Sequence, residues 1–206
     1  MQQIAQQAGT QTDAGSRQPE TFSTRLIITA DRAIYSFSGC WLAVANWLAA
    51  LYVSAIVLAP VLRAIGQDGL ASPIYRVFGL FCHQEADRSF HIEGNPLACC
   101  ERCAAVYFSL ALSGVLFGLI RTRIRSIQLH EVALLISPLV IDGMAVGAGM
   151  YPGNVLVRAV TGLLFGIGAI WWLYPRVDAG FAATRANLEA MFDRLVAQGR
   201  AKPLLP

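Results

Sequence analysis

Charged residues are scarce in this 206-residue chain. Lys, Arg, Asp and Glu make up 14% of it and hydrophobic residues make up 55%, whereas a typical soluble domain is about 25% charged. This composition argues against an ordinary soluble protein and indicates one that contacts a lipid bilayer. The net charge of +3 is too small to indicate nucleic-acid binding, so no nucleic-acid partner is expected.

Several familiar signals are also missing. Residues 1–24 are rich in Gln, Ala, Thr and Ser and lack the short apolar core of a signal peptide, so the first spanning helix is expected to act as an uncleaved anchor. The chain has no phosphate-binding loop, no serine-centred triad and no paired acid/base carboxylates. Hydrolase and nucleotide chemistry therefore have no support, and the expectation leans away from an enzyme.

Long apolar runs are what the chain has instead. Stretches long enough to span a bilayer predict transmembrane helices at about 41–60, 104–120, 129–150 and 155–174. The predicted fold is an all-α, four-helix transmembrane bundle. We expect a disordered tail at 1–32, a four-span membrane domain at 33–175 and a cytoplasmic amphipathic helix and tail at 176–206.

Two further segments are amphipathic or too short to cross the membrane. The run from Pro73 to Cys82 suits a helix that lies at the outer interface before the second span. After the last span, apolar residues recur at helical spacing between charges, which predicts a helix on the inner leaflet or against a partner. These residues are Phe181, Leu188, Phe192, Leu195 and Val196.

The arginines predict the orientation. One side of the membrane would carry 11 basic residues, in the N-terminal tail, in the link between spans two and three, and in the C-terminal tail. The other side would carry Arg63, Arg76, Arg88 and Arg102, offset by five acids. By the positive-inside rule, both termini are cytoplasmic and loop 82–103 faces outward, in the plasma (inner) membrane of a prokaryote.

Small residues indicate where helices pack closely. Ser113–Gly118 in span two and Thr161–Gly166 in span four both contain small residues four positions apart. Such patterns let two helix backbones approach each other.

Loop 82–103 holds four of the five cysteines and two of the three histidines. Cys100 and Cys103 stand one helical turn apart, so both sulfurs can face one metal ion. Together with Cys82 and His83 they make a ligand set that suits tetrahedral Zn²⁺ in a structural or binding role. Neighbouring residues rarely reach the same ion, so His91, Cys99 or a carboxylate remains an alternative fourth ligand.

Other functions remain open. In an oxidising compartment, Cys82 and Cys100 or Cys103 can form a structural disulfide. A surface C-x-x-C can also exchange disulfides, as in a membrane thiol oxidoreductase coupled to quinone. A third alternative is an accessory subunit of a membrane complex, or a homo-oligomer, given the glycine faces and the amphipathic C-terminal helix.

Further polar residues are predicted at the level of the cysteines. Asp142 lies in span three and Arg158 near the start of span four, and an ion pair between them would bracket the turn that contains Asn154. Arg88 in the loop and Arg102 beside the cysteines are further candidates for a polar site.

Three of these motifs together resemble a known family. Cys82-His83-Gln84, then Arg88-Ser89-Phe90, then Cys100-Glu101-Arg102-Cys103, are similar to the pattern of a multi-pass prokaryotic membrane family, domain of unknown function 2085. The resemblance covers roughly residues 70–170. It departs at Ala105 and Ser109, where glycines are expected, and at 144–146, which is less polar than expected. The resemblance supports the choice of site residues and implies no reaction.

Overall fold

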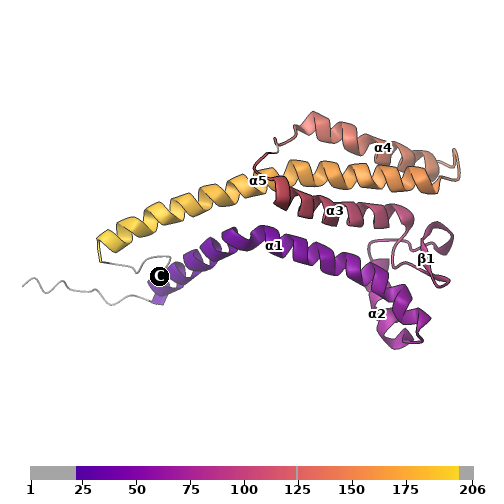
Figure 1. Cartoon of the computed structure of the whole chain (residues 1–206), viewed down its shortest axis with the longest axis horizontal. Helices are drawn as coiled ribbons and strands as arrows, with labels where there is room; N and C mark the ends of the chain where they lie inside the picture. Colours follow the sequence, from indigo (N-terminus) through magenta and orange to yellow (C-terminus); the bar gives the residue numbers. More distant parts are fainter. Residues whose placement is uncertain (1–21, 124, 200–206) are drawn as a thin grey trace, which may run out of the picture. The chain divides into compact units, whose positions relative to one another are not determined.

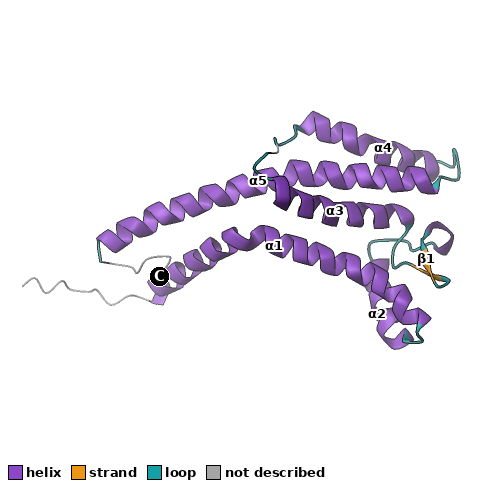
Figure 2. Ribbon diagram, in the orientation of Figure 1, coloured by secondary structure: helices purple, strands orange, loops and turns teal. Residues whose placement is uncertain are grey.

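The computed structural model describes residues 22–123 and 125–199, and it is almost wholly helical (Figures 1 and 2). The elements in chain order are α1 (Phe22–Ala64), α2 (Asp68–Gly79), the 3-10 turn η1 (Ala86–Arg88), β1 (His91–Ile92), β2 (Asn95–Pro96), α3 (Glu101–Ile120), α4 (Leu129–Gly147) and α5 (Val155–Ala197). The two strands are two residues long and pair antiparallel in a small hairpin. The predicted all-α class is confirmed.

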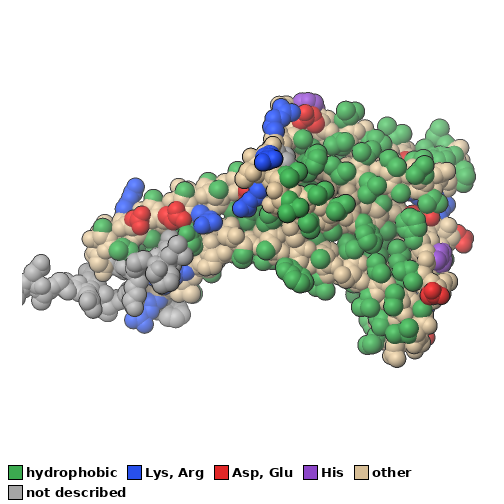
Figure 3. Space-filling view, viewed as in Figure 1, with side chains coloured by type: hydrophobic (Ala, Val, Ile, Leu, Met, Phe, Trp, Pro, Cys, Tyr) green, Lys and Arg blue, Asp and Glu red, His purple; other side chains and the backbone are tan. Residues whose placement is uncertain are grey.

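Four helices are long and apolar enough to cross a membrane, as predicted. They are α1, α3, α4 and α5. Helices α1, α3 and α5 each contain one expected span, whereas α4 ends at Gly147, three residues before the expected end at 150. Many of their large side chains point outward, including Trp47, Leu119 and Leu134, each about three-quarters exposed. Figure 3 shows apolar side chains over much of the visible face. Such a surface suits lipid rather than water.

Helices α1 and α5 are each 43 residues long, or roughly 65 Å at 1.5 Å per residue. This is about twice the ~30 Å hydrocarbon thickness of a bilayer. Helix α1 begins at Phe22, inside the 1–32 segment expected to be a tail, because no glycine or proline interrupts residues 22–38. The expected amphipathic segment after 175 is not a separate helix but continues α5 through Pro175. The rest of the predicted tail, 1–21, lies outside the described residues, as does 200–206.

The chain divides into two compact units, which join within α1 and within α5. One unit contains α1 up to Phe37 and α5 from Thr184. In it, the Tyr35 hydroxyl donates a hydrogen bond to Glu189 over 2.8 Å, and the Arg185 guanidinium lies 5.1 Å from the centre of the Tyr35 ring. The other unit, Ser38–Ala183, contains the four spans and the cysteines.

Helix α2 is the short amphipathic helix expected before the second span. It begins at Asp68, five residues earlier than predicted, and buries Ala71 and Phe78 while Leu70 and Val77 stay exposed. Phe78 packs in a core that also contains Ile56 of α1, Leu97 of the loop and Ala104 of α3. This core attaches the loop with the cysteines to two spans.

Helices α3 and α5 approach closely through the small-residue pattern predicted on α5. The pattern predicted on α3 instead meets α1, since a methyl group added at Gly114 would meet Asn46 Oδ1. A methyl group added at Gly166 would lie 2.5 Å from Ser109 Oγ and 2.9 Å from the Leu110 backbone nitrogen. One added at Gly162 would lie 2.9 Å from Ala105 Cβ and from the Arg102 carbonyl oxygen. The Ser109 hydroxyl also donates to the Leu163 carbonyl over 2.8 Å. Ala105 and Ser109 therefore serve the close packing for which glycines were expected.

Gly166→Ala is expected to destabilise the protein by about 2 kcal/mol, because the methyl group has no room beside Ser109. Thermal unfolding in detergent measures the effect. Gly180→Ala, on the same helix, is the matched control: an added methyl there meets nothing within 4 Å, so stability should stay equal or rise slightly. Equal behaviour of the two variants would contradict the packing of α3 on α5.

Candidate metal centre

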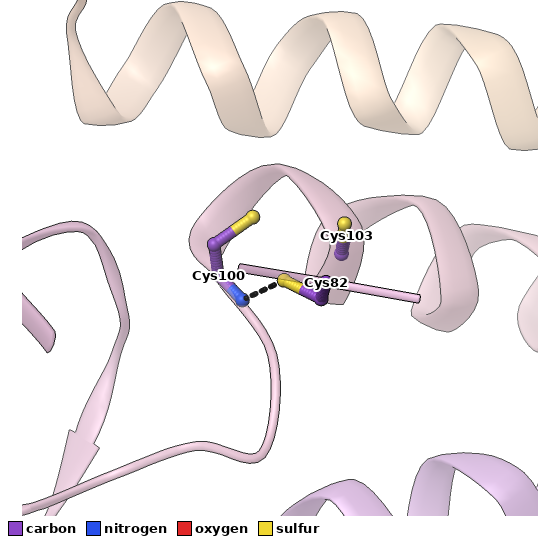
Figure 4. A group of neighbouring side chains, drawn as sticks. All are labelled: Cys82, Cys100 and Cys103. Carbon is purple, nitrogen blue, oxygen red and sulfur yellow. Dashed lines mark hydrogen bonds between the residues drawn. The ribbon is translucent and has the colours of Figure 1, made fainter. Parts of the chain in front are cut away.

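Three cysteines from the two ends of loop 82–103 come together beside the start of α3. Cys82 follows α2, Cys100 is the residue before α3, and Cys103 lies in its first turn. Their three sulfur atoms all lie within 4.8 Å of one another (Figure 4). The backbone N–H of Cys100 donates a hydrogen bond to Cys82 Sγ over 3.2 Å. The structure thus groups three of the four predicted metal ligands.

The fourth predicted ligand, His83, is not one of this group, although it lines the same cavity. Its side chain is exposed. Of the alternatives, His91 is exposed on β1, and Cys99 is fully buried in the core beside Ile56 and Phe78. Burial raises the pKa of the Cys99 thiol to about 12.

The pKa of the Cys100 thiol is shifted in the opposite direction, downward. The neighbouring Cys103 thiol lowers the pKa of Cys100 to about 5, and the backbone amides of Cys103 and Arg102 at the start of α3 act in the same direction. A sulfur at a helix N-terminus lies at the positive end of the helix dipole, which favours its thiolate. The thiolate is the form that binds metals.

The other motif residues shape the loop. The Gln84 side-chain amide donates to the Tyr75 carbonyl over 2.8 Å and to the Ala98 carbonyl over 2.6 Å. Ser89 Oγ donates to the Glu85 carbonyl over 2.9 Å, and the Phe90 carbonyl accepts from Leu97 N–H over 2.7 Å. The Cys-His-Gln and Arg-Ser-Phe motifs marked these residues in the sequence. The motifs did not predict which hydrogen bonds the side chains form.

The buried ion pairs differ from the predicted Asp142–Arg158 pair. Arg158 Nη1 lies 3.2 Å from Glu101 Oε2, and Arg158 Nη2 donates to the Pro152 carbonyl over 2.9 Å. Arg102 instead pairs with Asp142. The reason is that α3 begins with an acid and a base, Glu101 and Arg102. Each can therefore pair with the opposite charge on a neighbouring helix, Glu101 with α5 and Arg102 with α4. Glu101 is the functional candidate that sequence reasoning missed.

The remaining predicted polar residues have different positions. Asn154 is a helix cap, since its Oδ1 accepts a hydrogen bond from Leu156 N–H over 2.7 Å at the start of α5. Arg88 is exposed and lies 2.8 Å from Glu85 in an ion pair. Asn154 therefore has a structural role, whereas Arg88 borders the site.

The three sulfurs lie at the wall of a cavity of about 250 Å³. Arginines from three elements line it together with the thiols, one acid and apolar residues of the rim. The lining residues are Phe81, Cys82, His83, Glu85, Arg88, Cys100, Arg102, Cys103, Val146 and Arg158. A cluster of soft ligands is thus placed at the edge of a cationic cavity.

Comparison with known proteins agrees with the motifs. Residues 82–172 match the family described as "predicted membrane protein (DUF2085)". The chain is also 25% identical over 134 residues to the uncharacterized protein MJ1492 of Methanocaldococcus jannaschii, which covers 61% of this chain and 85% of that protein. No solved structure matches the chain. The family resemblance inferred from the motifs is confirmed.

A double-mutant cycle tests the ion pairs. Glu101→Gln and Arg158→Gln are each expected to cost about 3 kcal/mol, because each leaves one buried charge without its partner. The double variant should be less destabilised than the sum, with a coupling of about 1 kcal/mol or more in detergent unfolding. The corresponding cycle for Asp142→Asn with Arg158→Gln should be close to additive. Coupling in this second cycle and none in the first would instead support the predicted Asp142–Arg158 pair.

Proposed function

We propose that this chain is an integral membrane protein whose Cys82, Cys100 and Cys103 hold one Zn²⁺ ion at the outer face of the plasma membrane. The observation that carries the proposal is the convergence of three thiols within 4.8 Å. The ion would join the end of α2 to the start of α3. Its role is structural or ligand-binding.

The geometry supports a tetrahedral thiolate site. Two sulfurs bound to the same Zn²⁺ at about 2.3 Å stand ~3.8 Å apart in a tetrahedron. The sulfurs here need to close by about 1 Å or less, which side-chain rotation supplies. Clustered thiolates prefer Zn²⁺ to hard cations such as Mg²⁺ or Ca²⁺.

The surroundings support negatively charged sulfur. The Cys100 N–H bond to Cys82 Sγ is of the kind that stabilises a thiolate. Arg88, Arg102 and Arg158 line the same cavity. A cluster of thiolates without such charges and a metal ion would repel itself.

Metal analysis of the purified protein tests the proposal. We expect about one zinc per chain, and less than a tenth of that in Cys100→Ser or Cys103→Ser. Cys40→Ser is the matched control, because Cys40 is exposed on α1 outside the cluster, and it should keep its zinc. A folded, zinc-free wild type would refute the proposed site.

A disulfide is the rival reading, and thiol counting separates the two. A zinc site leaves all five cysteines alkylated after chelation and denaturation without reductant. A disulfide between Cys82 and Cys100 or Cys103 would leave only three alkylated until a reductant is added. The second result, found together with absent zinc, would establish the disulfide.

The orientation is proposed from the distribution of arginine. A membrane-impermeant maleimide, applied to whole spheroplasts after chelation, should label Cys82, Cys100 or Cys103 in a Cys40→Ser background. A fluorescent protein fused to the C-terminus should stay on the cytoplasmic side. Labelling only after the membrane is opened would reverse the assignment.

A further inference from the structure

The three thiols leave one side of the candidate metal centre open. Zn²⁺ takes four ligands, and in sites with three protein ligands the fourth position holds water or an exchangeable molecule. Within the part of the chain that the structure describes, the clustered ligands number three. Of the other candidates, His83 lines the cavity but is exposed and outside the cluster, and Cys99 is buried in the core and does not line the cavity.

The walls of the cavity carry positive charge at this open side. Arg88 comes from the loop, Arg102 from α3 and Arg158 from α5, and one acid, Glu85, lines the cavity with them. Two of the arginines' partners, Glu101 and Asp142, are buried and do not line it. Each arginine has a carboxylate partner, yet a guanidinium group has five N–H donors, more than these ion pairs use.

Two of these arginines are held rigidly. Arg158 is only 7% exposed and is fixed by Glu101 and the Pro152 carbonyl. Arg102 is fixed by Asp142, while its buried Nε has no hydrogen-bond partner. A buried N–H without a partner costs free energy that a bound acceptor would recover. Guanidinium groups recognise carboxylate and phosphate oxygens in particular.

We propose that the fourth position of the metal is taken by an oxyanion, a carboxylate or phosphate group that enters the cavity and is held by Arg88 and Arg102. The proposal rests on the proposed zinc site. An oxygen of the anion displaces water from the metal, and no proton transfer is required. The cavity of about 250 Å³ has room for some eight waters at ~30 Å³ each, so it admits one phosphate group.

Cobalt substitution provides the test. Full-length protein in dodecylmaltoside, stripped of zinc and loaded with Co²⁺, should show thiolate charge-transfer and tetrahedral d–d bands. Adding inorganic phosphate, or acetate, should shift the d–d bands with saturation. Arg88→Gln should weaken phosphate binding about tenfold, while the thiolate bands remain. Arg88 is exposed, so its replacement should not unfold the protein.

Arg76→Gln is the matched control: the same charge change, on exposed Arg76 of α2, away from the cavity lining. It should bind phosphate as the wild type does. Equal weakening in both variants would show a nonspecific charge effect and overturn the proposal. Cobalt bands that do not respond to either anion would also overturn it but leave the metal site standing. Absent thiolate bands would refute the metal site itself.

A second arm identifies the source of the oxyanion. The cobalt protein is placed in nanodiscs of phosphatidylcholine alone or with phosphatidylglycerol or phosphatidate, in phosphate-free buffer. A shift of the d–d bands with anionic lipid assigns the site to a headgroup. A shift that appears only with added phosphate or acetate assigns it to a free anion. Both support the proposal, and no shift under any of these conditions overturns it.

Discussion

Arg158 is buried in a bundle that faces lipid, and its guanidinium requires a partner. Glu101 supplies that partner at 3.2 Å, and Glu101 lies directly between Cys100 and Arg102 in the chain. The ion pair therefore fixes the first turn of α3 against α5. Because the thiols of Cys100 and Cys103 are on this turn, the cost of burying one charge determines where the sulfur cluster lies.

The same turn also receives the second ion pair, between Arg102 and Asp142 of α4. Further along α5, the close contact of Gly162 and Gly166 with α3 fixes how α3 and α5 pack against each other. The membrane helices thus serve as the rigid support of the site, and loop 82–103 supplies Cys82. Rigid support of this kind reduces the movement needed when a ligand binds.

Much of the fold follows from the sequence because a bilayer imposes a simple rule. A run of apolar residues must form a helix to satisfy its own backbone, so all four spans were found from composition, and α3 and α5 begin within a few residues of the expected positions. The helix ends were harder to predict. Gly149, at φ +70, follows the end of α4 at Gly147 and explains why this helix is shorter than the apolar run that continues to Met150.

The site was predicted only in part. Spacing alone placed Cys100 and Cys103 on one face of a helix, and the Cys-His-Gln motif drew attention to Cys82. The partners of the charges could not be predicted from the sequence. Asp142 and Arg158 are of opposite charge and flank one turn, but the first turn of α3 provides a closer partner for each of them. The exclusion of Cys99 from the cluster depends on the loop path, which no periodicity in the sequence encodes.

Gln84 holds the two ends of the cysteine loop together. Its amide bridges the Tyr75 and Ala98 carbonyls, so the two ends of a loop of 17 residues between Cys82 and Cys100 are already joined by the protein alone. In small zinc domains the ion must order the chain, and part of the binding free energy is consumed in folding it. Here the loop is joined without an ion, so the proposed metal ion would not have to order the chain. Its binding free energy would then go into affinity rather than into folding.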